Sequence, residues 1–330
     1  MRLLPLLLVP ALALSLLRCS SPEPRSFEEA DAAVASSSGG PAVDDPDPGL
    51  QQEGGTSDAT PGVCTEDIDV VLVIDTSSSM NFVLDALEDE FADVVETSNA
   101  LKTGAHFGAV FFQDNVLLDA TGDEEGGKVH LGADSLASAF ATMRDVYTAN
   151  NRNPGDGPDG PTTQNPLCEE NALDALAAAA TQYPWRANAA RIVVLVTDDT
   201  FLERPDNYGD RDGDGDTTGT GYPKEGNYPA ASTVAETVQS LQNGAIKVFS
   251  FTRLKAPGFL DLGKCGTGRR HPSDEAVTYG WSKPYGNQAP IPEQTGGKNF
   301  DLDLVKSGSV HLGDAISDIV LQTRCGGVVN

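Results

Sequence analysis

Two uninterrupted apolar runs, Val70–Ile74 and Ile192–Val196, mark the pattern of hydrophobic and polar positions along the chain. Each run is bounded by polar residues and is too short to form a buried helix of ordinary length. Such runs are typical of strands that are buried on both faces of a parallel sheet. The pattern therefore predicts two central strands, over about 69–75 and 191–197.

Helical spacing follows the first of these strands and recurs later in the chain. Leu84, Leu87, Phe91 and Val94 repeat every three or four positions and predict a helix over about 80–99. The same reasoning predicts further helices over 134–147, from Glu169 onward, over 230–243, and around Leu312–Val320, and further strands over 107–112, 246–251 and 299–302. Val116–Leu118, after a turn at Asp114-Asn115, predicts an antiparallel edge strand.

Alternating strands and helices predict an α/β fold with a doubly wound, mainly parallel sheet and one antiparallel edge strand. In such sheets, ligands bind at the carboxyl ends of the strands. Candidate chemistry is therefore sought where the two central strands end.

The N-terminus has the features of a secretion signal. Arg2 precedes the apolar run Leu3–Leu17, which is too short and too interrupted by proline to span a bilayer as a mature helix. The segment that ends in Cys19 resembles a bacterial lipobox, although Arg18 stands where a small residue is usual. We expect residues 1–18 to be a lipoprotein signal peptide and Cys19 to be lipidated. The alternative is an ordinary signal peptide that is cleaved nearby.

Residues 19–62 have the composition of a tether. They are rich in Ser, Pro, Gly and Ala, and hold nine acidic residues against one basic residue, Arg25. Such a segment cannot bury enough surface to offset the entropy of ordering it, so we expect it to be disordered. We expect residues 63–330 to form one folded domain, held off the envelope of the cell, most simply the outer membrane of a Gram-negative bacterium.

The charge of the chain restricts its partners. The 330 residues carry a formal charge of −27, with 49 acidic residues against 22 basic ones. A surface this acidic repels phosphate backbones and anionic lipid headgroups, so we expect no nucleic acid partner and a membrane contact only through the lipid anchor. Cations are the natural counter-charge.

Four cysteines follow Cys19, and an even number in an exported chain predicts two disulfides. Three pairings are possible. Because the ends of a domain often lie close together, Cys64 with Cys325 is the favoured pair, which leaves Cys168 with Cys265. The alternative is four reduced thiols.

Oxygen-bearing side chains gather where the two central strands end. Asp75, Ser77 and Ser79 follow the first strand in the pattern D-x-S-x-S, and Asp198 follows the second. In a tight turn alternate residues can face one point, so these four side chains are expected to converge. Carboxylates and hydroxyls suit Mg²⁺, Mn²⁺ or Ca²⁺ and do not suit zinc or copper. A helix cap at Ser79 would explain one serine, but not the two acids.

These residues resemble the von Willebrand factor type A (VWA) domain and its metal-ion-dependent adhesion site. The match covers Asp75-Thr-Ser-Ser-Ser79 after its apolar strand, Val196-Thr-Asp198, and Thr295-Gly-Gly-Lys-Asn-Phe300, within about 64–325. The resemblance implies a Rossmann-like fold, a metal at the top of the sheet, and a protein ligand that donates a carboxylate. It also implies a threonine ligand from a Gly-rich loop. Thr162 and Thr163 both lie in that region, and Thr163 is the favoured one. Asp199 departs from the family, which usually has glycine there.

A second group of acids, Asp210, Asp212, Asp214 and Asp216, alternates with arginine and glycines as in a calcium-binding loop. Gly221 occupies the position at which an EF-hand requires glutamate, so an additional Ca²⁺ site and a merely solvated loop remain open.

Enzyme signatures are weak. Asp67-Ile-Asp69 has the spacing of a phosphatase motif but precedes its strand, at the wrong end for a nucleophile, and the sequence contains no G-x-S-x-G elbow. We therefore expect no enzymatic activity, and a metal-dependent adhesion module on the cell envelope. The alternatives are a structural or assembly component of an envelope complex and, with less support, a hydrolase.

Overall fold

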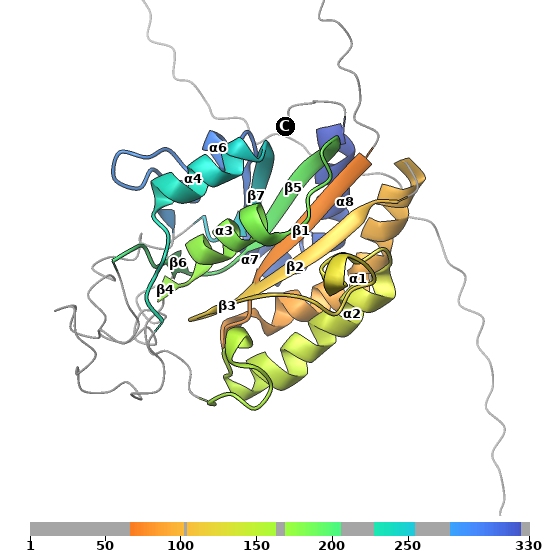
Figure 1. Cartoon of the computed structure of the whole chain (residues 1–330), viewed down its shortest axis with the longest axis horizontal. Coiled ribbons are helices and arrows are strands. Elements are labelled where there is room, and N and C mark those ends of the chain that lie inside the picture. Colours follow the sequence, from red (N-terminus) through yellow and green to blue (C-terminus); the bar gives the residue numbers. More distant parts are fainter. Residues whose placement is uncertain (1–66, 102–103, 163–168, 206–227, 255–277, 325–330) are drawn as a thin grey trace, which may run out of the picture. The chain divides into compact units, whose positions relative to one another are not determined.

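The computed structural model describes five stretches of the chain, and every element labelled in Figure 1 lies within them. They are residues 67–101, 104–162, 169–205, 228–254 and 278–324. All of them belong to one unit of the chain, Asp58–Asn330.

A six-stranded sheet forms the centre of this unit. Its order is β3 (Val116–Leu118), β2 (His106–Phe112), β1 (Asp67–Asp75), β5 (Ala189–Val196), β7 (Ile246–Thr252) and β8 (Asn299–Asp301). All neighbours pair in parallel except β2 and β3, which are antiparallel. This confirms the predicted fold class, a doubly wound, mainly parallel sheet with one antiparallel edge strand.

The order of the strands reverses between β1 and β5. From β1 the chain moves outward to β2 and β3, and it later returns to the other side of β1 to build β5, β7 and β8. A reversal of this kind leaves a crevice at the carboxyl ends of the two central strands, where doubly wound sheets bind their ligands.

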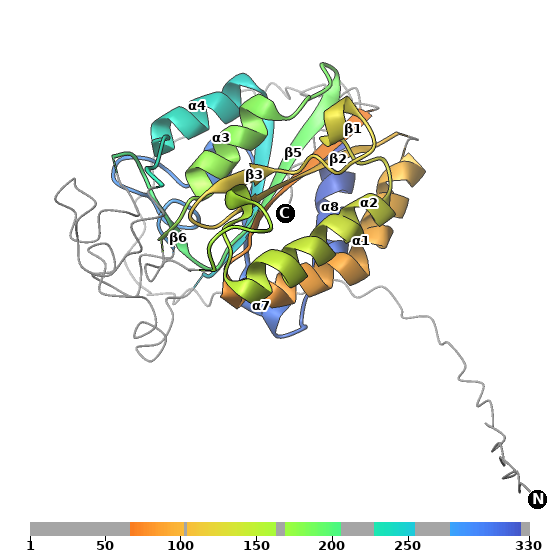
Figure 2. The same cartoon turned by 60° about the horizontal axis from the view of Figure 1, so that its bottom comes forward.

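Helices cover both faces of the sheet (Figures 1 and 2). One layer contains α1 (Asn81–Leu101), α2 (Ala133–Thr142), α7 (Leu302–Lys306) and α8 (Leu312–Arg324). The other contains α3 (Ala172–Gln182), α4 (Val234–Asn243) and α6 (Ile291–Gln294). No helix in the described stretches is long and apolar enough to cross a membrane.

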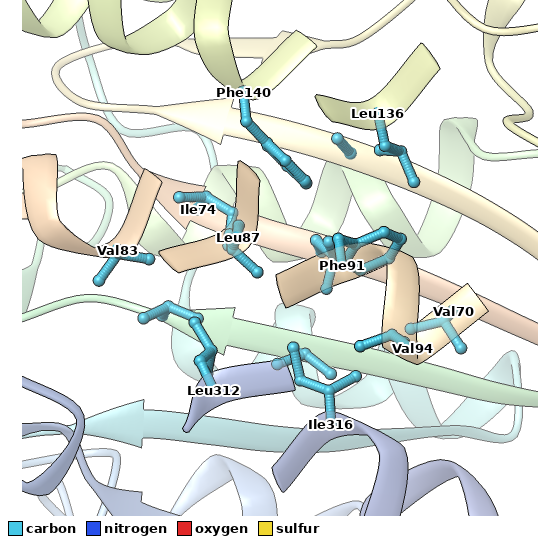
Figure 3. Packing of buried hydrophobic residues seen from close by; sticks show 14 of the residues in the cluster. Val70, Ile74, Val83, Leu87, Phe91, Val94, Leu136, Phe140, Leu312 and Ile316 are labelled. Carbon is cyan, nitrogen blue, oxygen red and sulfur yellow. The ribbon is translucent and has the colours of Figure 1, made fainter. Parts of the chain in front are cut away.

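Successive residues of β1 pack alternately against the two helix layers, and this explains why its apolar run is unbroken. Val70, Leu72 and Ile74 join the core beneath α1 and α8, whereas Val71 and Val73 join the core beneath α3 and α4. Figure 3 shows the first of these cores, where Phe91 of α1 meets the ring of Phe140 of α2 edge-on at 5.7 Å. Burial on both faces holds the strand rigidly, and so fixes the loop that leaves it.

The element expected from Glu169 onward is different. Glu169 and Glu170 do not form the first turn of a helix; they form a two-residue strand, β4, which pairs in parallel with β6 (Thr200–Phe201), just after Asp198. Helix α3 begins only at Ala172. The acidic pair favours a helix N-terminus by charge, but backbone pairing with the loop after β5 has the larger effect here.

The helix expected over 230–243 also begins later, at Val234. Thr233 and Glu236 form a capping box that fixes this start.

Candidate metal centre

Asp75 and Asp198 lie at neighbouring strand ends, on the two sides of the strand-order reversal. Asp75 is the last residue of β1, and Asp198 follows the last residue of β5 by two positions. Both side chains are at least nine-tenths buried. The sheet therefore brings together two carboxylates that are 123 positions apart in the sequence.

The turn after Asp75 directs its serines toward the same place. The backbone N–H of Ser77 donates to Asp75 Oδ1 over 2.7 Å, which folds the chain back on the carboxylate. A short 3-10 turn, Ser78–Met80, then leads into α1, and Ser77 precedes it without a side-chain capping bond. Capping therefore does not account for the hydroxyl group of Ser77.

A chain of contacts joins the two loops. The Oγ atoms of Ser77 and Ser79 lie 3.0 Å apart, and Ser79 Oγ donates to Asp198 Oδ1 over 2.9 Å. Ser77 is buried, whereas Ser79 is exposed, so the cluster opens to solvent at Ser79. The structure thus brings together the four predicted residues, although their binding of a metal stays a prediction.

These separations suit a small hard cation. In an octahedral Mg²⁺ shell with bonds of about 2.1 Å, adjacent ligand oxygens lie roughly 3 Å apart. The contact between Ser77 Oγ and Ser79 Oγ and the contact between Ser79 Oγ and Asp198 Oδ1 have that spacing. Within the described stretches, no group of three or more His, Cys, Asp or Glu side chains is placed to hold a metal, so a cation here would depend on the serine hydroxyls.

Threonines support the turn from behind. Thr197 Oγ1 donates to Asp75 Oδ2 over 2.7 Å and so fixes the orientation of that carboxylate. Thr76 donates from both its N–H and its Oγ1 to the carbonyl of Phe112, at the end of β2. Thr148 Oγ1 in turn donates to the carbonyl of Thr76 over 2.9 Å. The backbone of the loop is therefore held on both sides.

The buried carboxylates carry unbalanced negative charge. Burial first, and then the charge of Asp198, raise the pKa of Asp75 to about 7, against hydrogen bonds from Ser77 and Thr197 that lower it. Burial and the charges of Asp198 and Asp75 likewise raise the pKa of Asp199 well above its ordinary value. A divalent cation between Asp75 and Asp198 would relieve this repulsion.

Glu170 is a further acid of this cluster that sequence reasoning missed. Its side chain is 4% exposed, and no described residue hydrogen-bonds its Oε2. Burial, followed by the charges of Asp75, Asp114, Asp199 and Asp198, raises its pKa well above the ordinary value. Only the pairing of β4 with β6 brings Glu170 here, and nothing in the local sequence signals that pairing.

Arg253 is a positively charged residue beside these carboxylates, and sequence reasoning also missed it. It follows β7 directly, and its Nη2 lies 3.6 Å from Asp198 Oδ2. A signal was available in this case, because Arg253 stands just beyond the carboxyl end of the strand predicted over 246–251, and ligands bind at the carboxyl ends of such strands.

The acids at the other end of β1 have a different role. Asp69 is fully buried, and its carboxylate accepts the Nε and the backbone N–H of Arg186 over 2.7 and 2.8 Å. Asp67 lies at the same end of β1 and is an ion-pair partner of Arg186. The Asp-x-Asp pair thus ties the amino end of the sheet to the segment before β5, far along the strand from Asp75.

Several predicted residues lie outside the described residues. They are Thr163, the four acids Asp210, Asp212, Asp214 and Asp216, and the cysteines Cys19, Cys64, Cys168, Cys265 and Cys325. Thr162 is described and is exposed. The threonine ligand, the calcium loop, the lipidation and the disulfides therefore stay predictions.

Comparison with known proteins finds similarity at the level of three-dimensional structure. No protein-family model and no curated protein sequence matches the chain. Among solved structures, a von Willebrand factor type A protein from Catenulispora acidiphila is similar over 78% of this chain and 43% of its own, with 12% identity and a TM-score of 0.40.

Proximal thread matrix protein 1 from the mussel byssus is similar over 79% of this chain and 49% of its own, with 13% identity and a TM-score of 0.38. A second structure of that protein, described as having a zinc occupied MIDAS motif, matches with 12% identity and the same TM-score. The chain thus spans less than half the length of these proteins. The fold class stated above rests on the strand order of this chain itself.

Proposed function

We propose that this chain is a metal-dependent protein-binding module, in which a divalent cation held by Asp75, Ser77, Ser79 and Asp198 takes a carboxylate from a protein partner. The observation that supports this most is the continuous contact from Ser77 through Ser79 to Asp198, which links the ends of β1 and β5 at the strand-order reversal. Mg²⁺ or Mn²⁺ fits this oxygen set best, and Ca²⁺ is the larger alternative.

The donor set also suits the binding of an outside acid. Two carboxylates balance the charge of a divalent cation, while two neutral hydroxyls donate weakly, so the ion would remain electrophilic. The exposure of Ser79 gives an external oxygen a path to the ion. We further propose Thr163 as an additional ligand, and a Ca²⁺-binding role for the loop with Asp210 and Asp216.

We also propose that the chain is exported and anchored by lipid at Cys19, with its acidic segment 19–62 as a tether, and that it is not an enzyme. The support for the anchor is the apolar N-terminal run that ends at Cys19. Incorporation of labelled fatty acid into the wild-type chain, but not into Cys19→Ser, would test it.

The central test compares two buried aspartates on the same strand. Asp75→Asn should abolish Mn²⁺ binding, measured by electron paramagnetic resonance, and should abolish Mg²⁺-dependent retention of a carboxylate-bearing peptide on beads. Asp69→Asn, which removes the buried negative charge that pairs with Arg186 at the opposite end of β1, should cost stability and leave Mn²⁺ binding unchanged. Equal Mn²⁺ uptake by wild type and Asp75→Asn would overturn the proposal.

The alternatives predict different outcomes. An assembly component would co-purify with envelope proteins in EDTA as well as in Mg²⁺. A hydrolase would turn over small phosphoesters or peptides, and that turnover would be lost in Asp75→Asn.

A further inference from the structure

Arg253 lies beside the proposed metal ligands and makes two long ion pairs with described residues. Its Nη2 is 3.6 Å from Asp198 Oδ2, and its Nε is 3.9 Å from Asp303 Oδ1. Both distances are within the range of an ion pair and beyond that of a hydrogen bond. Within the described stretches, the guanidinium group makes no shorter polar contact.

The surroundings of Arg253 restrict the access of solvent to its side chain. The side chain is only 18% exposed, so most of its surface is removed from solvent. A guanidinium group has five N–H donors in a planar fork, so Arg253 can offer donors to an acceptor that arrives from outside. Several other described arginines donate hydrogen bonds to acceptors. Arg186, for example, donates to Asp69 and to two backbone carbonyls over 2.7–2.8 Å.

The position of Arg253 connects it with the ligand of the metal. β7 is the neighbour of β5 in the sheet, so Arg253 and Asp198 follow adjacent strand ends. The guanidinium group approaches Asp198 through Oδ2, whereas Ser79 contacts Oδ1 of the same carboxylate. Arg253 therefore flanks the serine–aspartate cluster on the side of β7.

We propose that Arg253 selects the chemical class of the partner's group, a carboxylate in preference to an amide or a hydroxyl. This inference rests on the proposed function. A carboxylate has two acceptor oxygens, so one can approach the cation while the other accepts from the guanidinium fork. An amide of the same shape would turn its NH₂ group toward the guanidinium, where two donors face each other. A hydroxyl offers only one oxygen.

The test uses two bead-bound peptides that differ in one atom group: a glycine pentapeptide with a central glutamate, and the same peptide with glutamine. In Mg²⁺, the wild-type chain should be retained at least tenfold better on the glutamate beads. Arg253→Gln should lose this preference while binding Mn²⁺ with at least wild-type affinity, because the cation no longer has a positive neighbour. Arg253→Lys, which keeps the charge but not the fork, should retain part of the preference.

Arg204→Gln is the matched control. Arg204 is exposed and pairs with Glu236 of α4, so its loss should change neither Mn²⁺ affinity nor the preference for glutamate. Thermal unfolding shows which variants fold. If Arg253→Gln does not fold, the preference of folded Arg253→Lys for the glutamate beads is the deciding measurement.

Failures of the two proposals are distinguishable. If Arg253→Gln folds, binds Mn²⁺ and keeps the full preference for glutamate, the inference about Arg253 is wrong and the proposed function stands. If the wild-type chain binds no Mn²⁺, or retains the glutamate peptide equally in EDTA, the proposed function is wrong, and the inference is lost with it.

Discussion

At the scale of the residue, the carboxylates of the cluster differ in how far hydrogen bonds hold their oxygens. Asp75 accepts from Ser77 and Thr197, and Asp198 accepts from Ser79. Glu170 is equally buried, but no described residue hydrogen-bonds its Oε2. Burial favours the neutral form of this acid, and a cation nearby would favour its ionisation.

Glu170 should therefore strengthen metal binding without being one of the four proposed ligands. We expect Glu170→Gln to weaken Mn²⁺ affinity at pH 8 by roughly tenfold, since the variant cannot supply negative charge to the field around the ion. At pH 6 the difference should be smaller than at pH 8, because the pKa of Glu170 is raised by burial and its protonated form, which lower pH favours, resembles glutamine.

Electron paramagnetic resonance of free Mn²⁺ during titration measures both affinities. Glu293→Gln, on exposed α6 residue Glu293, is the control and should match wild type at both pH values. Equal affinities of wild type and Glu170→Gln at pH 8 would show that Glu170 does not act on the metal.

At the scale of the element, the central strands and their ends were predictable, and the short pairings were not. In an apolar run such as Val70–Ile74 every residue is hydrophobic because every residue is buried, so the strand can be predicted. The rule that ligands bind at the carboxyl ends of strands then points to Asp75 and Asp198. The pair β4–β6 has two residues on each side, too few for any periodicity to register. The local sequence therefore does not predict that Glu170, which this pairing places in the site, lies there.

Gly297, in the segment Thr295–Phe300, has to be glycine for a steric reason. A Cβ added to Gly297 would lie 1.8 Å from the carbonyl oxygen of Val248, in the neighbouring strand β7. Thr295 fixes the same approach, because its Oγ1 accepts the N–H of Val248 over 3.1 Å. Only glycine permits the entry to β8 to pass this close to β7.

We expect Gly297→Ala to lower the free energy of unfolding by about 3 kcal/mol, because backbone must move to relieve the overlap. Gly132→Ala is the control. A Cβ there meets nothing within 4 Å, and the change at this helix N-cap should cost about 1 kcal/mol or less. Urea denaturation measures both, and equal losses in the two variants would contradict this view of Gly297.

At the scale of the whole molecule, the metal centre should make stability depend on pH in a direction that the cation reverses. The pKa of Asp75 is raised from an ordinary value of 3.8 to about 7. Between these values the folded chain binds a proton that the unfolded chain has already released, so the contribution of Asp75 to stability is lost as pH rises toward 7. His106 acts in the opposite sense, since burial lowers its pKa.

The effect of Asp75 is isolated by comparing wild type with Asp75→Asn in EDTA. From pH 5 to pH 8, the melting temperature of wild type should fall relative to that of the variant. The corresponding loss in the free energy of unfolding is on the order of a few kcal/mol. Mg²⁺ binds the ionised carboxylates, so the melting-temperature gain of wild type in Mg²⁺ should be small at pH 5 and largest at pH 8. Because Asp75→Asn lacks the first ligand, Mg²⁺ should raise its melting temperature at neither pH. Parallel melting curves for the two chains in EDTA, or a Mg²⁺ gain that is equal at pH 5 and pH 8, would mean that Asp75 is not the protonated partner of the site.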